Sequence, residues 1–496
     1  DYGSGDMSFQ NPYWIMNKMI NQTKKRRYML SANLKYDVTD WLDVTGRVKV
    51  DNADMDITEK RYAGTDTNFA GEKGMYSIIK RNDRQIYADA IANIDLTFAG
   101  DYHLSANVGA SLKDVRMDFM GWGGDLRKIP NFFSITNIST TNYKEREDGS
   151  HIQSQSIFAN VELAWKSMLY LTVTGRNDWE SALAFSKYKS FFYPSVGLSV
   201  VLSQLIPNMP ENLSYIKLRG SFASVGVAFE RYIANPLYSW NESGLSWNTQ
   251  TQYPAYHLKP ERTKSFEVGL TMRFLKHFNL DFTYYNSHTS NQTFDPQISG
   301  GTGFSKIIIQ SGNVRNQGIE LALGYRNTWR DFTWDTNYTL STNQNKIISL
   351  ANNVINYATG ERFSIDRLNM GGLGDALFLL QEGGTLGDLY SRRDLRYDEN
   401  NAIYIDENGN VATETIQDVK KYVKLGSVLP DANMSWRNDF RWKNLNFGFM
   451  ISARLGGIVY SRTQAMLDQY GVSEVTAAAR DAGGVTLNGG DVVDAY

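Results

Sequence analysis

Residues Ser265–Ser287 read SFEVGLTMRFLKHFNLDFTYYNS, and apolar and polar side chains alternate on both sides of a short break at residues 275–277. Strict alternation with a period of two over this length indicates β-strands with one apolar and one polar face. Because the break is short, the two runs are expected to form an antiparallel hairpin. The apolar positions are Phe266, Val268, Leu270, Met272 and Phe274, followed by Phe278, Leu280, Phe282 and Tyr284.

The same hairpin pattern recurs along the chain and predicts seven hairpins with 14 strands in total. The turns inside the hairpins are short, whereas most connections between hairpins are long. A long polar connection is expected from about Asp51 to Arg84, and the longest spans about Thr342 to Asn433. Short turns on one rim and long loops on the other are typical of outer-membrane β-barrels. The hairpins are expected at residues 28–50, 86–112, 157–173, 194–222, 266–284, 319–340 and 434–455.

Composition excludes several classes of protein. No apolar run reaches the 18 residues that a membrane helix needs, and mean hydropathy is -0.41 with 42% apolar residues. A barrel is compatible with these values, because only alternate residues of each strand face lipid. The net charge of -2 gives no reason to expect a nucleic-acid partner, and the absence of Cys excludes disulfides and thiolate metal sites.

A soluble all-β array is the main alternative architecture, but its strands are usually shorter and its connections less uneven. Several strands here reach ten residues, about what a tilted strand needs to cross a bilayer. Aromatic residues also gather at the short turns, as in the aromatic belt of a membrane interface. These residues are Tyr36, Trp41, Tyr102, Trp165, Trp329 and Trp442.

The polar face predicts a wide interior. Charged and amide side chains on nearly every strand require a lumen that is wet or holds a polar plug. Fourteen strands ending in open edges cannot lie in hydrocarbon, because each edge would leave backbone groups unpaired. Further strands are therefore expected before Asp1 and after Tyr496, and both ends of the sequence are interpreted as cuts.

The sequence resembles the SusC/RagA-type TonB-dependent transporters of Bacteroidetes outer membranes. Each matching block is short, but the blocks occur in the same order over almost the whole chain. The blocks are Asn11-Pro12-Tyr13-Trp14, Gly175-Arg176-Asn177-Asp178-Trp179, Phe192-Tyr193-Pro194-Ser195-Val196, Lys217-Leu218-Arg219-Gly220-Ser221-Phe222, Leu258-Lys259-Pro260-Glu261, Glu267-Val268-Gly269, Asn316-Gln317-Gly318-Ile319-Glu320-Leu321, Gly387-Asp388-Leu389-Tyr390, Pro430-Asp431 and Gly456-Gly457-Ile458-Val459-Tyr460.

The resemblance implies a transmembrane barrel of about 22 strands, of which residues 1–496 supply about 14. Five strands would precede Asp1 and three would follow Tyr496. It also implies an N-terminal plug that contacts TonB, which this sequence lacks, and a SusD-like surface lipoprotein that acts as a lid. Transporter–lid pairs that dimerise, and a glycan or oligopeptide ligand, are expectations of the same kind.

A loop rich in aromatic residues, from Val227 to Arg262, is the predicted ligand-binding region. Flat aromatic faces beside amide groups suit a sugar or a peptide. The alternative is that these side chains pack against neighbouring loops or a partner protein. The candidates are Tyr238, Trp240, Trp247, Tyr253 and Tyr256, together with Trp179 at a strand end.

Five charged residues on polar faces are candidates for contact with the transport path or the plug. The alternative is that neighbours or water in the lumen satisfy their charges. They are Arg176, Asp178, Arg219, Arg273 and Arg326.

The sequence gives little support for an enzyme. The five His residues lack metal-ligand spacing, and no nucleophile lies in a recognisable pattern with a base. No cofactor or metal is predicted, and residues Asp406–Asn410 are interpreted as a hairpin turn rather than a cation site. Import of a nutrient across the outer membrane is the leading hypothesis, with a passive porin of similar geometry as the alternative.

Overall fold

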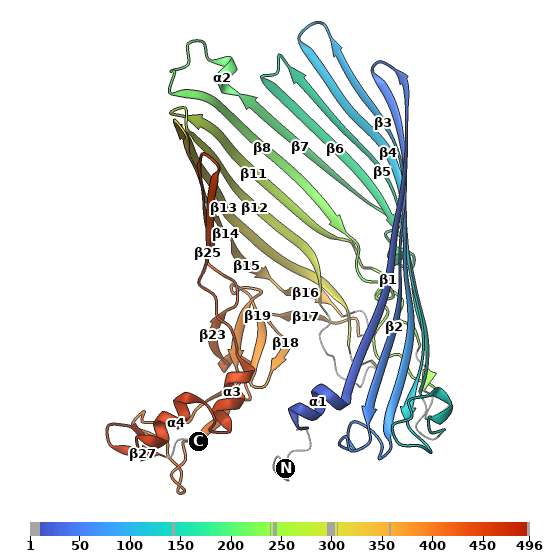
Figure 1. Cartoon of the computed structure of the whole chain (residues 1–496), viewed down its shortest axis with the longest axis vertical. Coiled ribbons are helices and arrows are strands. Elements are labelled where there is room, and N and C mark those ends of the chain that lie inside the picture. The colour runs from blue at the N-terminus through green and yellow to red at the C-terminus, as the bar shows by residue number, and fades with distance from the viewer. Residues whose placement is uncertain are drawn as a thin grey trace. The chain divides into compact units, whose positions relative to one another are not determined.

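The computed structural model describes residues 10–140, 144–238, 240–241, 246–294, 303–304, 306–356 and 359–493. Antiparallel strands follow one another in a 15-stranded sheet, and 14 of them form a path from β1 to β25 (Figure 1). The predicted number of strands is therefore confirmed. Among the described residues, this path does not return from β25 to β1, so the sheet does not close.

The chain divides into two compact units, and the first comprises residues 1–166 and 172–194. It opens with a short helix whose first residue is Pro12, which is a favoured position for proline. The side chain of the N-cap residue Asn11 accepts a 2.9 Å hydrogen bond from the backbone of Tyr13. Long strands follow. The elements are α1 (Pro12–Lys18), β1 (Met19–Thr39), β2 (Leu42–Tyr62), β3 (Gly74–Phe98), β4 (Tyr102–Asp125), η1 (Ile135–Asn137), β5 (Lys144–Trp165), β6 (Leu169–Glu180) and η2 (Ser181–Leu183).

The second unit comprises residues 167–171 and 195–496. Its part of the main sheet consists of β7 (Phe191–Val201), β8 (Leu213–Val227), β11 (Glu261–Phe274), β12 (Phe278–Phe294), β13 (Ile309–Trp329), β14 (Phe332–Thr342), β24 (Ala432–Trp442) and β25 (Leu445–Leu455). Shorter elements lie in its connections and after β25: α2 (Leu202–Leu205), β9 (Trp240–Asn241), β10 (Ser246–Trp247), α3 (Arg462–Gln469), α4 (Glu474–Asp481), β26 (Val485–Leu487) and β27 (Asp491–Val493).

The hairpin at Ser265–Ser287 forms as the alternation predicts. Phe274 pairs with Phe278, and Leu270 pairs with Phe282, so the apolar side chains of both strands share one face. The turn between them has positive φ at Leu275 (50°) and Lys276 (64°), which matches the twist of the flanking strands.

The apolar face of the sheet is exposed in both units. Leu34 in β1 is 74% exposed and Val268 in β11 is 41% exposed. Apolar side chains that lie open along a whole face are unfavourable in water, but a lipid-facing wall requires them. Within the part of the chain that the structure describes, no helix is long and apolar enough to cross a membrane.

The strands extend well beyond the predicted apolar runs, so the expected long connection from Asp51 to Arg84 is wrong. β2 continues to Tyr62 and β3 begins at Gly74, and the two strands pair along their whole length without a shift. The sequence pattern failed here because the amphipathic pattern inverts. Beyond Tyr28 the formerly apolar face carries charged residues, while apolar residues move to the opposite face. The charged positions are Arg26, Asp54, Lys80, Arg84 and Arg116, and the apolar ones are Met55, Ile57, Ile79 and Met117.

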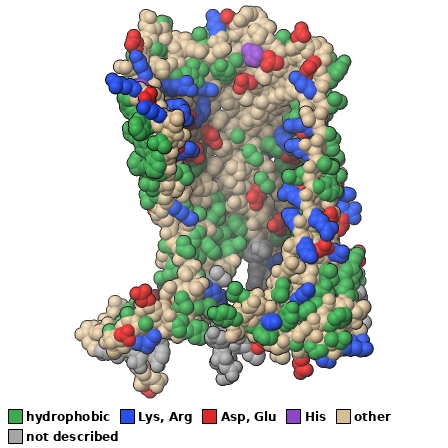
Figure 2. Space-filling view, viewed as in Figure 1, with side chains coloured by type: hydrophobic (Ala, Val, Ile, Leu, Met, Phe, Trp, Pro, Cys, Tyr) green, Lys and Arg blue, Asp and Glu red, His purple; other side chains and the backbone are tan. Residues whose placement is uncertain are grey.

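This inversion marks where the wall leaves the membrane. Inside the bilayer only the lipid-facing side can be apolar, because the other side borders a wet lumen. Above the bilayer the outward face meets water, so charged residues are favoured there. Figure 2 shows hydrophobic, basic and acidic side chains intermixed at the lower right, over the ends of these strands.

The longest predicted loop, from Thr342 to Asn433, is a folded region with its own core. Its strands are β15 (Gln344–Ser349), β16 (Ala351–Ile355), β17 (Arg362–Ile365), β18 (Arg367–Leu373), β19 (Ala376–Gln381), β20 (Asp388–Ser391), β21 (Arg393–Leu395), β22 (Thr413–Thr415) and β23 (Val423–Ser427), with η4 (Val419–Lys421). Ile347 and Leu350 lie buried in a cluster with Phe294, Ile307 and Val314. Because Phe294 ends β12 and Val314 belongs to β13, this cluster packs the folded connection against the long-loop ends of the wall strands.

Asp406 closes the turn that the sequence predicted in this region. Its carboxylate accepts backbone hydrogen bonds from Asn410 (2.8 Å) and Asn408 (2.9 Å), and Ile405 bridges Val411 across the turn. The hydrogen bond from Asn410 is the main reason that the pKa of Asp406 lies below its ordinary value.

We expect Asp406→Ala to speed proteolysis within residues 404–411, because two backbone amides lose their acceptor. Asp406→Asn keeps an acceptor oxygen and should cleave at the wild-type rate. Limited proteolysis followed by mass spectrometry measures both rates. Equal cleavage of the Ala variant and the wild type would show that the carboxylate does not hold the turn.

Candidate functional site

A charged cluster centred on Arg219 lies on the polar face of the second unit. The guanidinium donates to Asp281 at 2.8 and 3.2 Å, to Thr271 Oγ1 at 2.8 Å and to Thr283 Oγ1 at 2.6 Å. These residues come from β8, β11 and β12, so one side chain joins three strands. Gly269 makes this possible, because a Cβ there would lie 2.4 Å from Arg219 Nε.

A second cluster lies in the first unit and contains two of the predicted residues, Arg176 and Asp178. Arg176 Nε donates to Asp178 Oδ1 at 2.8 Å, and its Nη2 donates to Ser156 Oγ at 2.7 Å. The hydroxyl of Tyr193 donates to the other carboxylate oxygen of Asp178. Asp178 is buried, and each of its carboxylate oxygens accepts a hydrogen bond from a neighbouring side chain. These hydrogen bonds offset the cost of burying a charge.

The remaining two polar-face candidates are exposed. The guanidinium of Arg273 lies 5.7 Å from the ring centre of Tyr215, and Arg326 lies 3.9 Å from Asp335. All five charged candidates thus contact other side chains of the wall. Contact with a plug or a ligand remains a prediction for each of them.

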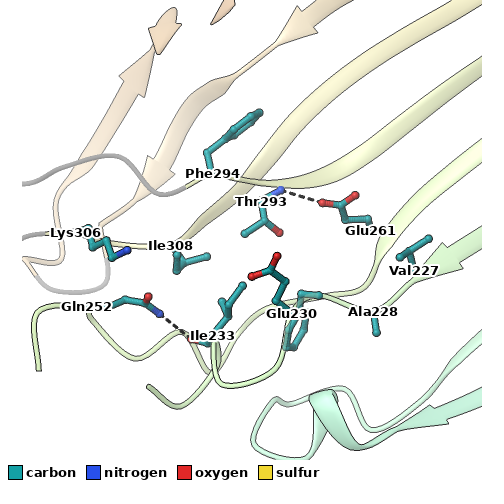
Figure 3. A pocket seen from close by; sticks show the side chains of 11 residues that line it. Val227, Ala228, Glu230, Ile233, Gln252, Glu261, Thr293, Phe294, Lys306 and Ile308 are labelled. Atoms are coloured by element: carbon teal, nitrogen blue, oxygen red, sulfur yellow. Dashed lines mark hydrogen bonds between the residues drawn. The ribbon is translucent and has the colours of Figure 1, made fainter. Parts of the chain in front are cut away.

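A pocket of about 440 Å³ opens at the end of the wall where β8, β11 and β12 meet their long loops (Figure 3). Val227 and Glu261, which pair across β8 and β11, form one side of it. Both occupy polar-face positions, because Glu261 is an even number of residues from Glu267 and Thr271 in the same strand, and Val227 pairs with Glu261. The pocket therefore lies at the long-loop rim and on the lumen side of the second unit.

The pocket combines acidic side chains and the basic side chain of Lys306 with the aliphatic surface of Ile233 and Ile308. Glu230 and Glu261 supply carboxylates, and Glu261 accepts a 3.2 Å hydrogen bond from the backbone of Thr293. Gln252 donates to the carbonyl of Ile233 at 3.0 Å and leaves its amide oxygen for other partners (Figure 3). Such a lining can orient a polar ligand and also pack against its apolar parts.

The predicted aromatic residues whose side chains the structure describes lie outside this pocket. Tyr238, Trp247 and Tyr256 are exposed at 65%, 64% and 51%. Tyr253 packs edge to face on Phe304, with ring centres 5.2 Å apart, and against the buried cluster of the folded connection. The backbone of Trp240 pairs with Trp247, while its side chain falls outside the described residues. Ligand contact remains a prediction for these residues.

Trp179 lies on the opposite face from Arg176 and Asp178. It is 40% exposed and lines an open groove of about 900 Å³ with Leu112 and Ile157, which belong to the apolar face. The sequence alternation in β6 already contained this information, because Trp179 has the parity of Leu171 and Val173.

Sequence reasoning predicted the loop that forms most of the pocket but selected other residues in it. Glu230, Gln252 and Glu261 lie within the predicted ligand-binding region from Val227 to Arg262, where the aromatic residues were chosen instead. Thr293 and Lys306 lie outside that region, and only their coordinates bring them to the pocket.

An antiparallel sheet with an exposed apolar face, a hydrogen-bonded polar face and one rim of short turns is the wall of a membrane β-barrel. The family model for the β-barrel of TonB-dependent receptor-like proteins matches residues 2–457. The chain belongs to this family, and the predicted resemblance is confirmed.

Individual relatives agree with this assignment. TonB-dependent receptor P26 of Formosa agariphila is 25% identical over 479 residues, which cover 91% of this chain and 47% of that protein. TonB-dependent receptor SusC of Bacteroides thetaiotaomicron is 25% identical over 328 residues, covering 62% and 31%. The structure of the RagAB peptide importer in its open-open state superimposes with a TM-score of 0.74 at 15% identity, covering 92% of this chain and 50% of that chain.

The chain spans about half the length of the curated relatives it matches. The similarity to the importer shows the shared fold alone, because sequence identity is low.

Proposed function

We propose that this chain is the wall of a TonB-dependent transporter that imports a nutrient across the outer membrane. The ligand would be a glycan or an oligopeptide. A plug encoded before Asp1 would close the lumen, and TonB would pull on that plug to open a path. A SusD-like lipoprotein would cover the long-loop rim.

The observation that carries the proposal is the pocket on the lumen side of that rim. A ligand captured there would already lie at the entrance to the polar interior. Its carboxylates, amide and aliphatic side chains supply both hydrogen bonds and packing. The names of the relatives support the same reading, since two are receptors that depend on TonB and one assembly is a peptide importer.

The test is uptake by cells that carry the full-length protein. A panel of labelled glycans and oligopeptides is supplied with and without a functional TonB. We expect uptake of one class that stops when TonB is deleted. Uptake that continues without TonB would favour a passive porin and contradict the proposal.

Pocket variants test where the ligand binds. We expect Glu230→Gln combined with Gln252→Ala to raise the half-saturating ligand concentration about tenfold, since a lost charged hydrogen bond costs about 1.5–3 kcal/mol. Glu399→Gln changes an exposed carboxylate outside the pocket and serves as the control. Unchanged uptake by the pocket variant would place binding elsewhere.

A further inference from the structure

The apolar face of the second unit contains a groove of about 340 Å³ close to the short-turn rim. Its walls are Phe278, Leu323, Tyr325, Trp334, Tyr338 and Trp436, with Thr336 between them. Phe278 pairs with Tyr325, Tyr325 pairs with Thr336, and Tyr338 pairs with Trp436. The groove therefore crosses four neighbouring strands, β12, β13, β14 and β24, on one face. Because Leu270 and Phe282 share this face, the groove opens toward lipid.

The two indole walls of the groove are fixed by hydrogen bonds within the sheet. Trp436 Nε1 donates to Thr336 Oγ1 at 2.9 Å, and Trp334 Nε1 donates to Asn438 Oδ1 at 3.1 Å. Hydrocarbon offers no acceptor for an indole N–H, so these two polar side chains satisfy groups that would otherwise be unpaired. This explains why the polar residues Thr336 and Asn438 occur on the lipid-facing side of the sheet.

Ring packing fixes a third wall. The ring centre of Tyr325 lies 5.3 Å from Trp334 and 4.8 Å from Phe278. A groove whose walls are held in place before binding loses little side-chain entropy when a flexible chain enters it. The cavity is therefore preformed.

Basic residues stand in the short turns beside the groove. Lys276, Arg330 and Lys443 lie in three neighbouring turns, and all three side chains are exposed. One carboxylate, Asp331, lies among them. The excess of positive charge at the edge of the apolar band is complementary to lipid phosphate.

We propose that this groove binds a phospholipid of the periplasmic leaflet. One acyl chain fills the groove between Trp334 and Tyr338, and the phosphate lies near Lys276 and Arg330. The short-turn rim faces the periplasm in outer-membrane barrels, which selects the inner leaflet. The proposal depends on the barrel fold and not on which ligand is imported.

Native mass spectrometry of the full-length protein in detergent, after addition of phosphatidylethanolamine, measures the bound lipid. Thr336→Leu fills the groove and removes the acceptor of Trp436, so we expect retention to fall about tenfold, equivalent to about 1.4 kcal/mol. Lys276→Gln with Arg330→Gln leaves the groove intact and should weaken retention mainly at low salt, because exposed charges are screened by salt.

Two control variants separate this site from general lipid binding. Val268→Leu lies on the same apolar face outside the groove, and Lys166→Gln lies in a short turn of the first unit. Both should retain lipid as the wild type does. Folding is checked by the mobility shift on heating; if Thr336→Leu does not fold, the double turn variant decides. The proposal would be overturned if Thr336→Leu retained lipid as the wild type does, or if the double variant did so when Thr336→Leu does not fold. It would also be overturned if the protein retained lipopolysaccharide in place of phospholipid.

Discussion

Leu270→Arg is expected to prevent most of the protein from assembling in the membrane. Leu270 lies on the apolar face, five residues before the short turn, and its neighbours across the strands are Phe282 and Leu218. A cation there would face hydrocarbon, at a cost of about 2–4 kcal/mol near the middle of the bilayer. Folding from urea into lipid vesicles measures this change in the free energy of unfolding, and Leu321→Arg should behave alike.

The matched control is Glu267→Arg, on the polar face of the same strand, where the side chain is exposed. Its cost should be small. Thr271 is a poorer control than its polar-face position suggests, because its hydroxyl contacts both Arg219 and Asp281. Equal destabilisation by Leu270→Arg and Glu267→Arg would contradict the assignment of the two faces.

Asp388→Ala is expected to loosen the folded connection between β14 and β24. Asp388 is 1% exposed, and its carboxylate accepts hydrogen bonds from Thr385 at 2.6 and 3.0 Å and from Lys424 Nζ at 2.6 Å. Loss of the carboxylate removes this acceptor from the backbone and hydroxyl of Thr385 and from the ammonium group of Lys424. Hydrogen bonds to a charged group contribute about 1.5–3 kcal/mol, and we expect a local loss of about this size.

Hydrogen exchange of residues 376–391 measures this loss directly. Glu399→Ala, in an exposed turn of the same connection, should leave exchange unchanged. Wild-type exchange in Asp388→Ala would show that the connection is held by its apolar core alone.

The strands inside the membrane were predictable because one physical constraint governs them. Alternation between Phe266 and Tyr284 identified the hairpin, its turn and both faces, since lipid on one side and water on the other enforce a period of two. The same constraint ends at the membrane boundary. Around Asp54 and Arg84 the strands continue while the pattern inverts, so the sequence indicated loops where the structure has a sheet.

The candidate site was less predictable because its contacts are distant in sequence. Arg219 in β8 and Asp281 in β12 are separated along the chain by a long loop and by strand β11, and no local pattern pairs them. Tyr253 was predicted to meet a ligand, but it also has the apolar ring needed to cover Ile347 and its neighbours. Sequence identifies an aromatic residue in a loop, whereas burial depends on what folds beside it.

Cysteine scanning tests the central claim most directly, namely that the alternating faces meet lipid and water. These 496 residues contain no Cys, so single cysteines from position 266 to 273 add the only thiols in this part of the protein. Cells are labelled with a water-soluble and a lipid-soluble thiol reagent. The water-soluble reagent should modify positions 267, 271 and 273, and the lipid-soluble reagent should modify 266, 268, 270 and 272. Position 269 is left out of the comparison, because a Cβ there would lie 2.4 Å from Arg219 Nε. Water-soluble labelling at Val268→Cys and Leu270→Cys equal to that at Glu267→Cys would contradict the membrane wall.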